Sequence, residues 1–314
     1  MALNPRRSPF SPLVLVLSAA FPLTACGGEA STAGAAAPGK PVVWAAAWPI
    51  WSWANRIGGD LIDLRCVLPA GADVESFEPE RKTIAAIADA ELVLLHGAEL
   101  EHWAMHASLP LGIVVDACRP LTAELIKLPE GAAHSHGAGE HHVHDGHNPH
   151  VWLDPVLAQK QARAVHEGLL RILPEQRAAL DGRLATLLAD LEALDRECQA
   201  LRFATDDVVV TTHPTWAYLG KRYGWPLAEA HFHAEKELDD AGLTELAVAA
   251  GDKRVRAVLF EVPVPEAAQK RIRELLGAPC IVIDPDVTRS GEQLTRDTGA
   301  VLRAGVAALA AAMN

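Results

Sequence analysis

The sequence lacks the motifs by which zinc hydrolases, cysteine-ligated zinc sites and ATPases are recognised. It contains no His-Glu-x-x-His, no Cys-x-x-Cys and no Gly-x-x-x-x-Gly-Lys-Ser/Thr. These absences argue against a metalloprotease, a structural zinc site held by cysteines and a chain that binds ATP itself. Basic residues are also few, with 28 Lys and Arg against 40 Asp and Glu, for a net charge of -12. This acidic balance argues against nucleic acid as a partner.

Long hydrophobic runs are missing except near the N-terminus. An apolar run at 13–23 follows Arg6 and Arg7 and is too short to span a bilayer. It ends in Leu-Thr-Ala before Cys26, an order that resembles the lipobox of bacterial lipoproteins. We therefore predict a signal peptide at 1–25, lipidation of Cys26 and export to the cell envelope, on the periplasmic side or the outer face of the cytoplasmic membrane. The Gly-, Ala-, Ser- and Pro-rich stretch 26–41 is typical of a flexible tether.

Cysteine is scarce in the remainder of the chain. The four other cysteines are separated by long intervals, at Cys66, Cys118, Cys198 and Cys280. Export to an oxidising compartment permits a disulfide. The spacing favours buried thiols or at most one bridge, and the pairing stays open.

Short apolar runs alternate with helical patterns along most of the sequence, which predicts parallel β-sheets in an α/β fold. Strands are expected at 42–47, 61–68, 92–95, 113–115, 208–212, 255–260 and 280–283. Leucines at helical spacing predict one long helix at 174–203, and a further helix is expected at 291–312. The sequence thus predicts an N-terminal α/β lobe at 42–173, a linking helix and a C-terminal α/β lobe at 204–314.

Half of the 14 histidines fall between His134 and Pro155. The segment 133–148 is rich in glycine and poor in apolar residues, so we expect a mobile loop that captures metal loosely. Its histidines are His134, His136, His141, His142, His144 and His147. His150 differs, because the apolar Val-Trp-Leu and a helix start at Asp154-Pro155 follow it and give it a rigid frame suited to a metal ligand.

Four motifs in order resemble the zinc- and manganese-type solute-binding proteins of bacterial ABC transporters. They are GADVESFEP at 71–79, HVWLDP at 150–155, THP at 212–214 and IDP at 283–285, with LVLLHGAELEHW at 92–103 between the first two. The resemblance covers about 42–312. It implies two α/β lobes joined by a long, rigid helix, with a metal site in the cleft between the lobes.

The resemblance implies that His150, His213 and Asp284 are metal ligands. Where the family has a histidine in its first motif, this chain has Glu75. A carboxylate can bind zinc, so Glu75 is one candidate for the fourth ligand. His96, at the end of a predicted strand, is the alternative, and a degenerate, weaker site is a third interpretation.

The histidines favour Zn²⁺, whereas a second carboxylate suits Mn²⁺ or Fe²⁺ better. Four protein ligands leave no open position for substrate water, so we expect carriage of metal and no enzyme activity. We expect a monomer, and the resemblance implies that it delivers metal to a permease with its ATPase subunit. A surface metal buffer or adhesin is an alternative, and a zinc hydrolase is a weaker one.

Overall fold

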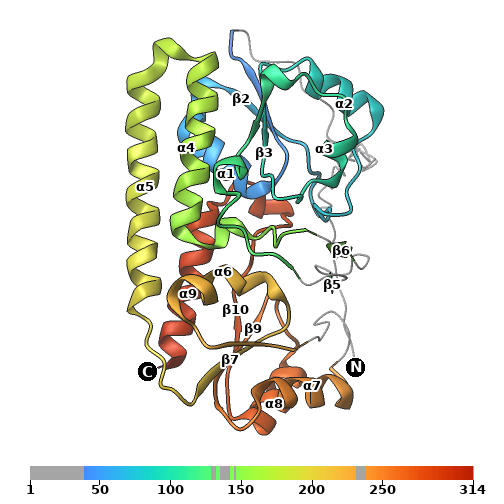
Figure 1. Ribbon diagram of the computed structural model, residues 1–314, viewed down its shortest axis with the longest axis vertical. Helices are drawn as coiled ribbons and strands as arrows, with labels where there is room; N and C mark the ends of the chain where they lie inside the picture. The colour runs from blue at the N-terminus through green and yellow to red at the C-terminus, as the bar shows by residue number, and fades with distance from the viewer. Residues whose placement is uncertain (1–38, 129–131, 135–141, 145, 231–237, 314) are drawn as a thin grey trace, which may run out of the picture. The chain divides into compact units, whose positions relative to one another are not determined.

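Two separate parallel β-sheets organise the part of the chain that the computed structural model describes, residues 39–128, 132–134, 142–144, 146–230 and 238–313 (Figure 1). The chain divides into two compact units, 1–32 and 33–314. All described residues belong to the second unit. The predicted signal peptide and Cys26 lie outside the described residues, so their roles stay predictions.

Each four-stranded sheet is parallel throughout, which confirms the predicted fold class. The first sheet has the order β2-β1-β3-β4 and the second β10-β9-β7-β8. The strands are β1 Val42–Ala45, β2 Asp63–Cys66, β3 Leu92–Leu95, β4 Val114–Asp116, β7 Asp207–Thr211, β8 Leu227–Glu229, β9 Arg254–Phe260 and β10 Cys280–Val282. Both faces of a parallel sheet are covered, so its strands read as continuous apolar runs, and this is why the sequence located most of them.

Helices connect the strands and cover the sheets (Figure 1). They are α1 Trp48–Gly58, α2 Arg81–Ala88, α3 His102–His106, α4 Pro155–Ile172, α5 Arg177–Ala200, α6 Ala217–Tyr223, α7 Asp240–Ala250, α8 Glu266–Leu276 and α9 Thr298–Met313. No helix among these described segments is both long and apolar enough to cross a membrane.

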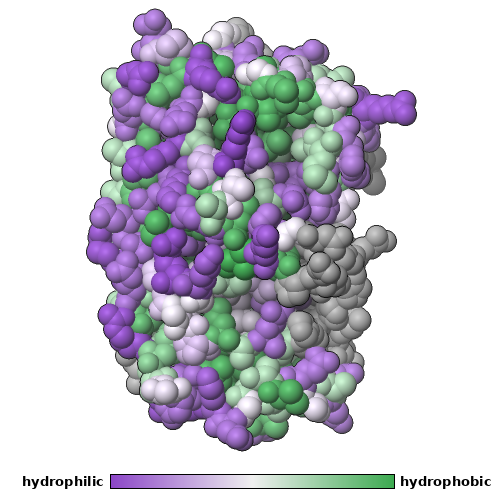
Figure 2. Space-filling view, viewed as in Figure 1, coloured by the Kyte–Doolittle hydropathy of each residue, from purple (hydrophilic) through white to green (hydrophobic). Residues whose placement is uncertain are grey.

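The predicted long helix is present as α5, which has 24 residues and follows a short 3₁₀ turn at Pro174–Gln176. It lies beside α4 and runs along both sheets (Figure 1). Its buried side chains are Leu180, Leu184, Leu187, Leu191, Leu194 and Cys198. Their alternating spacing of four and three places them on one stripe, which packs into the main hydrophobic core. Hydrophilic residues predominate along the edge where α5 lies in Figure 2.

The main core joins residues of both sheets through large tryptophan side chains. Trp53 from α1, Trp152 and Trp216 are almost completely buried. Trp48 is also buried, whereas Trp51 is half-buried.

The four described cysteines are free thiols, so they form no bridge with one another in this structure.

The predicted helix at 291–312 is interrupted in the structure. A 3₁₀ turn at Gly291–Thr295 is closed by a capping box between Ser290 and Gln293, and α9 begins only at Thr298. Between these two elements Arg296 is extended. The interruption lets Arg296 and Asp297 point to different partners, which the apolar periodicity of this segment does not reveal.

Candidate metal site

The candidate ligands lie in loops that follow the carboxyl ends of parallel strands. His213 comes two residues after β7, Asp284 two residues after β10, and His96 directly after β3. Loops at this end of the strands are where α/β folds bind their ligands. Hydrogen bonds between these loops, described below, bring the four sequence motifs together.

Asn148 aims the ring of His150. The amide oxygen of Asn148 accepts hydrogen bonds from the backbone nitrogen of His150 at 2.9 Å and from Nδ1 of His150 at 3.0 Å. An amide oxygen only accepts, so Nδ1 carries the proton and Nε2 carries the lone pair that a metal needs. The imidazole is fully buried and packs against Trp152, with 5.2 Å between ring centroids.

The helix start after His150 is as the sequence predicts. Asp154 accepts hydrogen bonds from the backbone nitrogens of Val156 and Leu157 and so caps α4. Arg222 of α6 also donates to Asp154, which is 2% exposed. Burial is the largest influence on this carboxyl and raises its pKa, while Arg222 acts in the opposite direction.

Asn148 also connects the second motif to the third. Its side-chain nitrogen donates to the carbonyl of Pro214 at 2.8 Å, and its own carbonyl accepts from the hydroxyl of Tyr218 at 2.8 Å. Pro214 is the residue next to His213. One asparagine therefore fixes the His150 ring and, at the same time, the position of the loop that carries His213.

His213 lies beside a buried carboxylate that the motifs did not identify. Nδ1 of His213 is 3.9 Å from Oε1 of Glu261, and the two side chains are 5% and 6% exposed. Thr215 donates a hydrogen bond to the same oxygen of Glu261. Glu261 directly follows β9, so its place at a carboxyl strand end was the available sequence signal.

The structure distinguishes Asp284 from its neighbour Asp286. Asp286 is 1% exposed and accepts hydrogen bonds from Nε and Nη2 of Arg289 and from Thr298. It has φ of +64°. Asp284 is one-third exposed, and its carboxylate is bound by Arg296 at 2.6 Å. The buried Asp286 therefore supports the loop, and Asp284 remains the accessible carboxylate.

The loop of Glu75 is linked to the Asp284 loop through Gly71. The backbone nitrogen of Gly71 donates to the carbonyl of Arg289 at 2.8 Å. Glu75 itself is 2% exposed, and its backbone carbonyl lies 3.2 Å from Nδ1 of His102. A further link joins the second and fourth motifs, because the indole nitrogen of Trp152 donates to the carbonyl of Pro285 at 2.7 Å.

Both ring nitrogens of His96 have protein partners. Nε2 donates to the carbonyl of Pro149 at 2.8 Å, and Nδ1 accepts from the amide of Gln161 at 3.2 Å. The residue is fully buried, and burial lowers its pKa to about 4. The neutral ring therefore supports the peptide that precedes His150.

Two short stretches of the histidine-rich region pair as strands, where the sequence predicted only a loop. Strand β5 (Ala132–His134) pairs antiparallel with β6 (His142–His144). Beyond it, His147 bridges to Lys127, and the backbone of Asn148 donates to Ile126. Backbone pairing does not require apolar side chains, which explains why composition did not reveal it. His136 and His141 lie outside the described residues.

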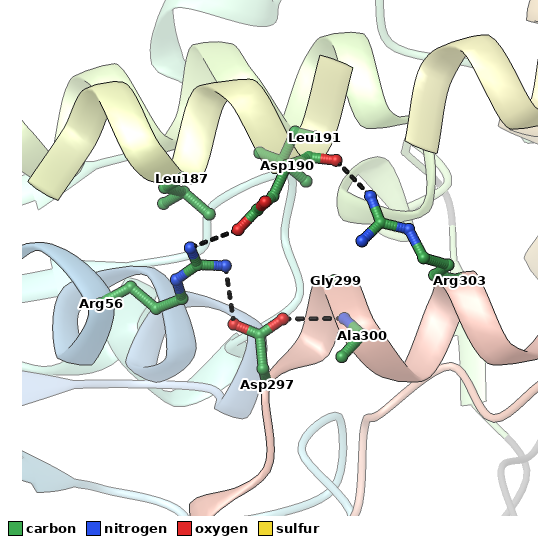
Figure 3. A pocket seen from close by; sticks show the side chains of 8 residues that line it. All are labelled: Arg56, Leu187, Asp190, Leu191, Asp297, Gly299, Ala300 and Arg303. Atoms are coloured by element: carbon green, nitrogen blue, oxygen red, sulfur yellow. Dashed lines mark hydrogen bonds and ion pairs between the residues drawn. The ribbon is translucent and has the colours of Figure 1, made fainter. Parts of the chain in front are cut away.

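Within the part of the chain that the structure describes, no three His, Cys, Asp or Glu side chains form a group that could hold a metal ion. The ligand set Glu75, His150, His213 and Asp284 therefore stays a prediction, although the loops that carry it are linked. A cavity of about 310 Å³ lies elsewhere, where Arg56 of α1 binds Asp190 of α5 and Asp297 beside α9 (Figure 3). None of the candidate ligands lines it.

Comparisons with known proteins agree with this arrangement. Residues 43–312 match the family described as "Zinc-uptake complex component A periplasmic". The chain is 26% identical over 293 residues to zinc-binding lipoprotein AdcA of Streptococcus pneumoniae, which covers 89% of this chain and 57% of AdcA. It is 27% identical over 279 residues to the high-affinity zinc uptake system protein ZnuA of Bacillus subtilis, with 84% of each covered.

Solved structures show the same fold. The Zn(II)-bound ZnuA-like domain of S. pneumoniae AdcA superimposes with a TM-score of 0.72 at 22% identity, over 88% of this chain and 99% of that domain. The complete Zn(II)-bound AdcA gives a TM-score of 0.70 at 21% identity, with 58% of its chain covered. The chain thus spans little more than half the length of AdcA.

Proposed function

Because this chain belongs to the family of periplasmic zinc-uptake complex component A proteins, we propose that it captures a zinc ion outside the cytoplasm and passes it to the permease of an ABC importer. The family consists of metal-binding transport proteins and not of enzymes, which confirms the expectation of no catalytic activity. The relatives AdcA and ZnuA are described as zinc-binding and as part of zinc uptake.

One observation carries the proposal for this chain's own residues. The hydrogen bond from Nδ1 of His150 to Asn148 leaves the lone pair on Nε2, on a ring that is buried and held by Trp152. Metal-binding histidines are oriented by such a second hydrogen bond.

We place Glu75, His150, His213 and Asp284 in the ligand set. The links Asn148 to Pro214, Trp152 to Pro285 and Gly71 to Arg289 support this choice, because they tie all four loops together. Glu75 is favoured over His96, whose two ring nitrogens bind Pro149 and Gln161. Recruitment of His96 as a ligand would break at least one of these contacts at a fully buried position.

Zinc fits two imidazoles and two carboxylates, since it accepts nitrogen and oxygen ligands in a tetrahedral arrangement. Manganese and iron remain the competing ions, because two carboxylates give a harder ligand set, which suits these ions better than an all-nitrogen set would. Histidines of the segment 133–148 would add a second, looser capacity for zinc. Anchorage through Cys26 would keep the protein near its permease, and an ATPase subunit would supply the energy, since the sequence has no ATP-binding loop.

The test is metal titration of the purified mature chain with zinc and manganese, by competition with a chelating dye. We expect one tight zinc site that His150→Ala and His213→Ala each abolish. His106→Ala is the matched control, because His106 is exposed on α3. Unchanged zinc affinity in both site variants would overturn the ligand assignment. Loss of zinc uptake in cells that carry His150→Ala would support transport, and normal uptake would favour storage of metal.

A further inference from the structure

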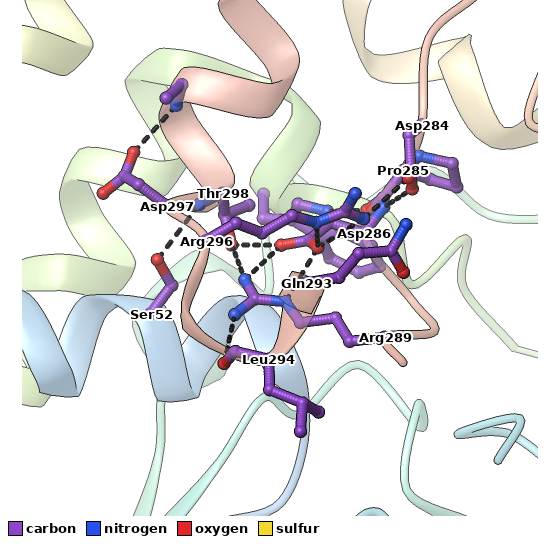
Figure 4. A network of polar contacts seen from close by, with 12 residues as sticks. Ser52, Asp284, Pro285, Asp286, Arg289, Gln293, Leu294, Arg296, Asp297 and Thr298 are labelled. Atoms are coloured by element: carbon purple, nitrogen blue, oxygen red, sulfur yellow. Dashed lines mark hydrogen bonds and ion pairs between the residues drawn. The ribbon is translucent and has the colours of Figure 1, made fainter. Parts of the chain in front are cut away.

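Arg296 binds the same carboxylate that we place in the metal site. Its guanidinium donates to Oδ2 of Asp284 at 2.6 Å and to Oδ1 of Asp286 at 3.0 Å (Figure 4). The side chain of Arg296 is only 22% exposed, so the contact with Asp284 is partly shielded from water. Such a contact is stronger than an ion pair on an open surface.

Asp286 does not need Arg296 to balance its negative charge. Arg289 binds both oxygens of Asp286, at 2.9 and 2.5 Å, and Arg289 and Asp286 are almost completely buried. Thr298 donates to Asp286 as well. Arg289 is held in turn over the rings of Trp48 and Trp51, at 5.3 and 5.6 Å from the ring centroids. The loop therefore keeps its shape through Arg289, and the pairing of Arg296 with Asp284 is a separate feature.

Both oxygens of Asp284 are engaged by this loop. Oδ1 accepts a hydrogen bond from the backbone nitrogen of Asp286 at 2.7 Å, and Oδ2 accepts from Arg296. A cation that binds through Oδ2 would compete with the guanidinium for that oxygen. A cation that binds through Oδ1 would approach a fixed positive charge on the same carboxylate, and arginine cannot relieve this repulsion by losing its proton.

We propose that Arg296 is a specificity-determining residue that competes with the metal ion for Asp284, an inference that rests on the proposed metal site. The competition weakens the contribution of Asp284 to every cation. An ion that gains most of its binding energy from the nitrogens of His150 and His213, such as Zn²⁺, tolerates this loss. An ion that depends on carboxylates, such as Mn²⁺, does not. Arg296 thereby favours zinc and also eases its release.

The experiment measures zinc and manganese dissociation constants of Arg296→Gln by chelator competition at fixed ionic strength. We expect the dissociation constant for zinc to fall by about tenfold. Manganese affinity should rise by a larger factor than zinc affinity. Arg296→Lys keeps the positive charge but loses the forked donors of the guanidinium. Its metal affinities should lie between those of the natural protein and Arg296→Gln. It also provides a second variant if Arg296→Gln folds poorly.

Arg303→Gln is the matched control, because it removes the same charge from α9. Arg303 contacts Glu197 and the backbone of Asp190, which both lie on α5 and are not candidate ligands. It should leave both dissociation constants unchanged. In a background of Asp284→Asn, the change Arg296→Gln should no longer tighten zinc binding, since the contested carboxylate is gone.

The outcomes separate this inference from the proposed function. If His150→Ala leaves zinc binding unchanged, the proposed site itself is wrong. If His150→Ala abolishes binding while Arg296→Gln leaves the affinities unchanged or weakens them, Arg296 does not compete and the inference is overturned. An equal tightening for zinc and manganese would overturn its specificity part.

Discussion

The amide oxygen of Asn148 lies 3.0 Å from Nδ1 of His150 and 2.9 Å from the backbone nitrogen of the same residue. The opposite end of this amide donates to the carbonyl of Pro214, beside His213. The two ends are not interchangeable, because one meets two donors and the other meets an acceptor. A single side chain thus sets the tautomer of one proposed ligand and the distance to the loop of another.

We predict that Asn148→Ala weakens zinc binding by about 10- to 100-fold, the range usual for the loss of a group that orients a metal ligand. The histidines would still be present, so binding should weaken and not disappear. Asn55→Ala is the control, because Asn55 is exposed on α1. Isothermal titration of both variants measures the effect. Equal affinities for the two variants would show that Asn148 does not orient the site.

Glu75 offers a direct test of metal preference. Changing it to histidine replaces an oxygen ligand by a nitrogen ligand in a position that is 2% exposed. We predict that Glu75→His raises the preference for zinc over manganese by about tenfold, since imidazole suits zinc and carboxylate suits manganese. Glu75→Gln should weaken binding of both ions. Competition between the two metals in one titration gives the ratio, and an unchanged ratio would exclude Glu75 as a ligand.

Local signals in the sequence predicted much of the fold. Strand β3 lies at the predicted residues, because a continuous apolar run between turns is what a buried parallel strand requires. Asp154-Pro155 predicted the start of α4, because a capping aspartate and a proline both act within the first turn of a helix. Helix α1 was missed, although Ile50, Trp53 and Ile57 are buried at helical spacing.

The candidate site was less accessible from sequence than the fold. Motifs indicated His150, His213 and Asp284, but their partners depend on contacts between distant segments. Glu261 reaches His213 across 48 positions. Arg296 reaches Asp284 only because the predicted helix at 291–312 is interrupted. No local pattern specifies such contacts, because they depend on how the loops of two sheets meet.

Arg56 connects α1 with α5 and with the residue that precedes α9, and we predict that its loss destabilises the protein. It binds Asp190 of α5 at 2.6 Å and Asp297 at 3.2 Å, and is 24% exposed. Arg56→Ala should lower the free energy of unfolding by about 1–2 kcal/mol, because two carboxylates lose their partner at a partly buried position. Arg196→Ala is the control, since Arg196 pairs with Glu192 on the open surface of α5. Denaturant unfolding of both variants decides, and equal losses would contradict the prediction.

The turn after β3 contains two buried groups whose pKa values move in opposite directions. Burial lowers the pKa of His96 from 6.5 to about 4. Burial also raises the pKa of Glu101 from 4.5 to about 7, although its carboxylate accepts hydrogen bonds from the backbone nitrogens of His96 and Gly97. The folded protein therefore favours a neutral His96 and a protonated Glu101 at mildly acidic pH.

These shifts predict opposite effects of pH on stability. Between pH 4 and 6.5 the unfolded state binds more protons at His96, so this contribution is complete above about 6.5 and is lost as pH falls. Between pH 4.5 and 7 the folded state binds more protons at Glu101, so its contribution is complete below about 4.5 and is lost as pH rises. Each contribution is about 3 kcal/mol at most, from 1.36 kcal/mol per pKa unit.

Two variants separate the contributions in metal-free protein held with a chelator. The stability of Glu101→Gln relative to the natural protein should increase as pH rises from 4.5 to 7. The variant lacks the Glu101 contribution, which the natural protein loses over this range. The stability of His96→Asn relative to the natural protein should decrease as pH rises from 4 to 6.5. The variant lacks the His96 contribution, which the natural protein gains over this range. Urea unfolding at intervals of half a pH unit gives both slopes. Flat differences for both variants would show that neither group titrates with folding in this range.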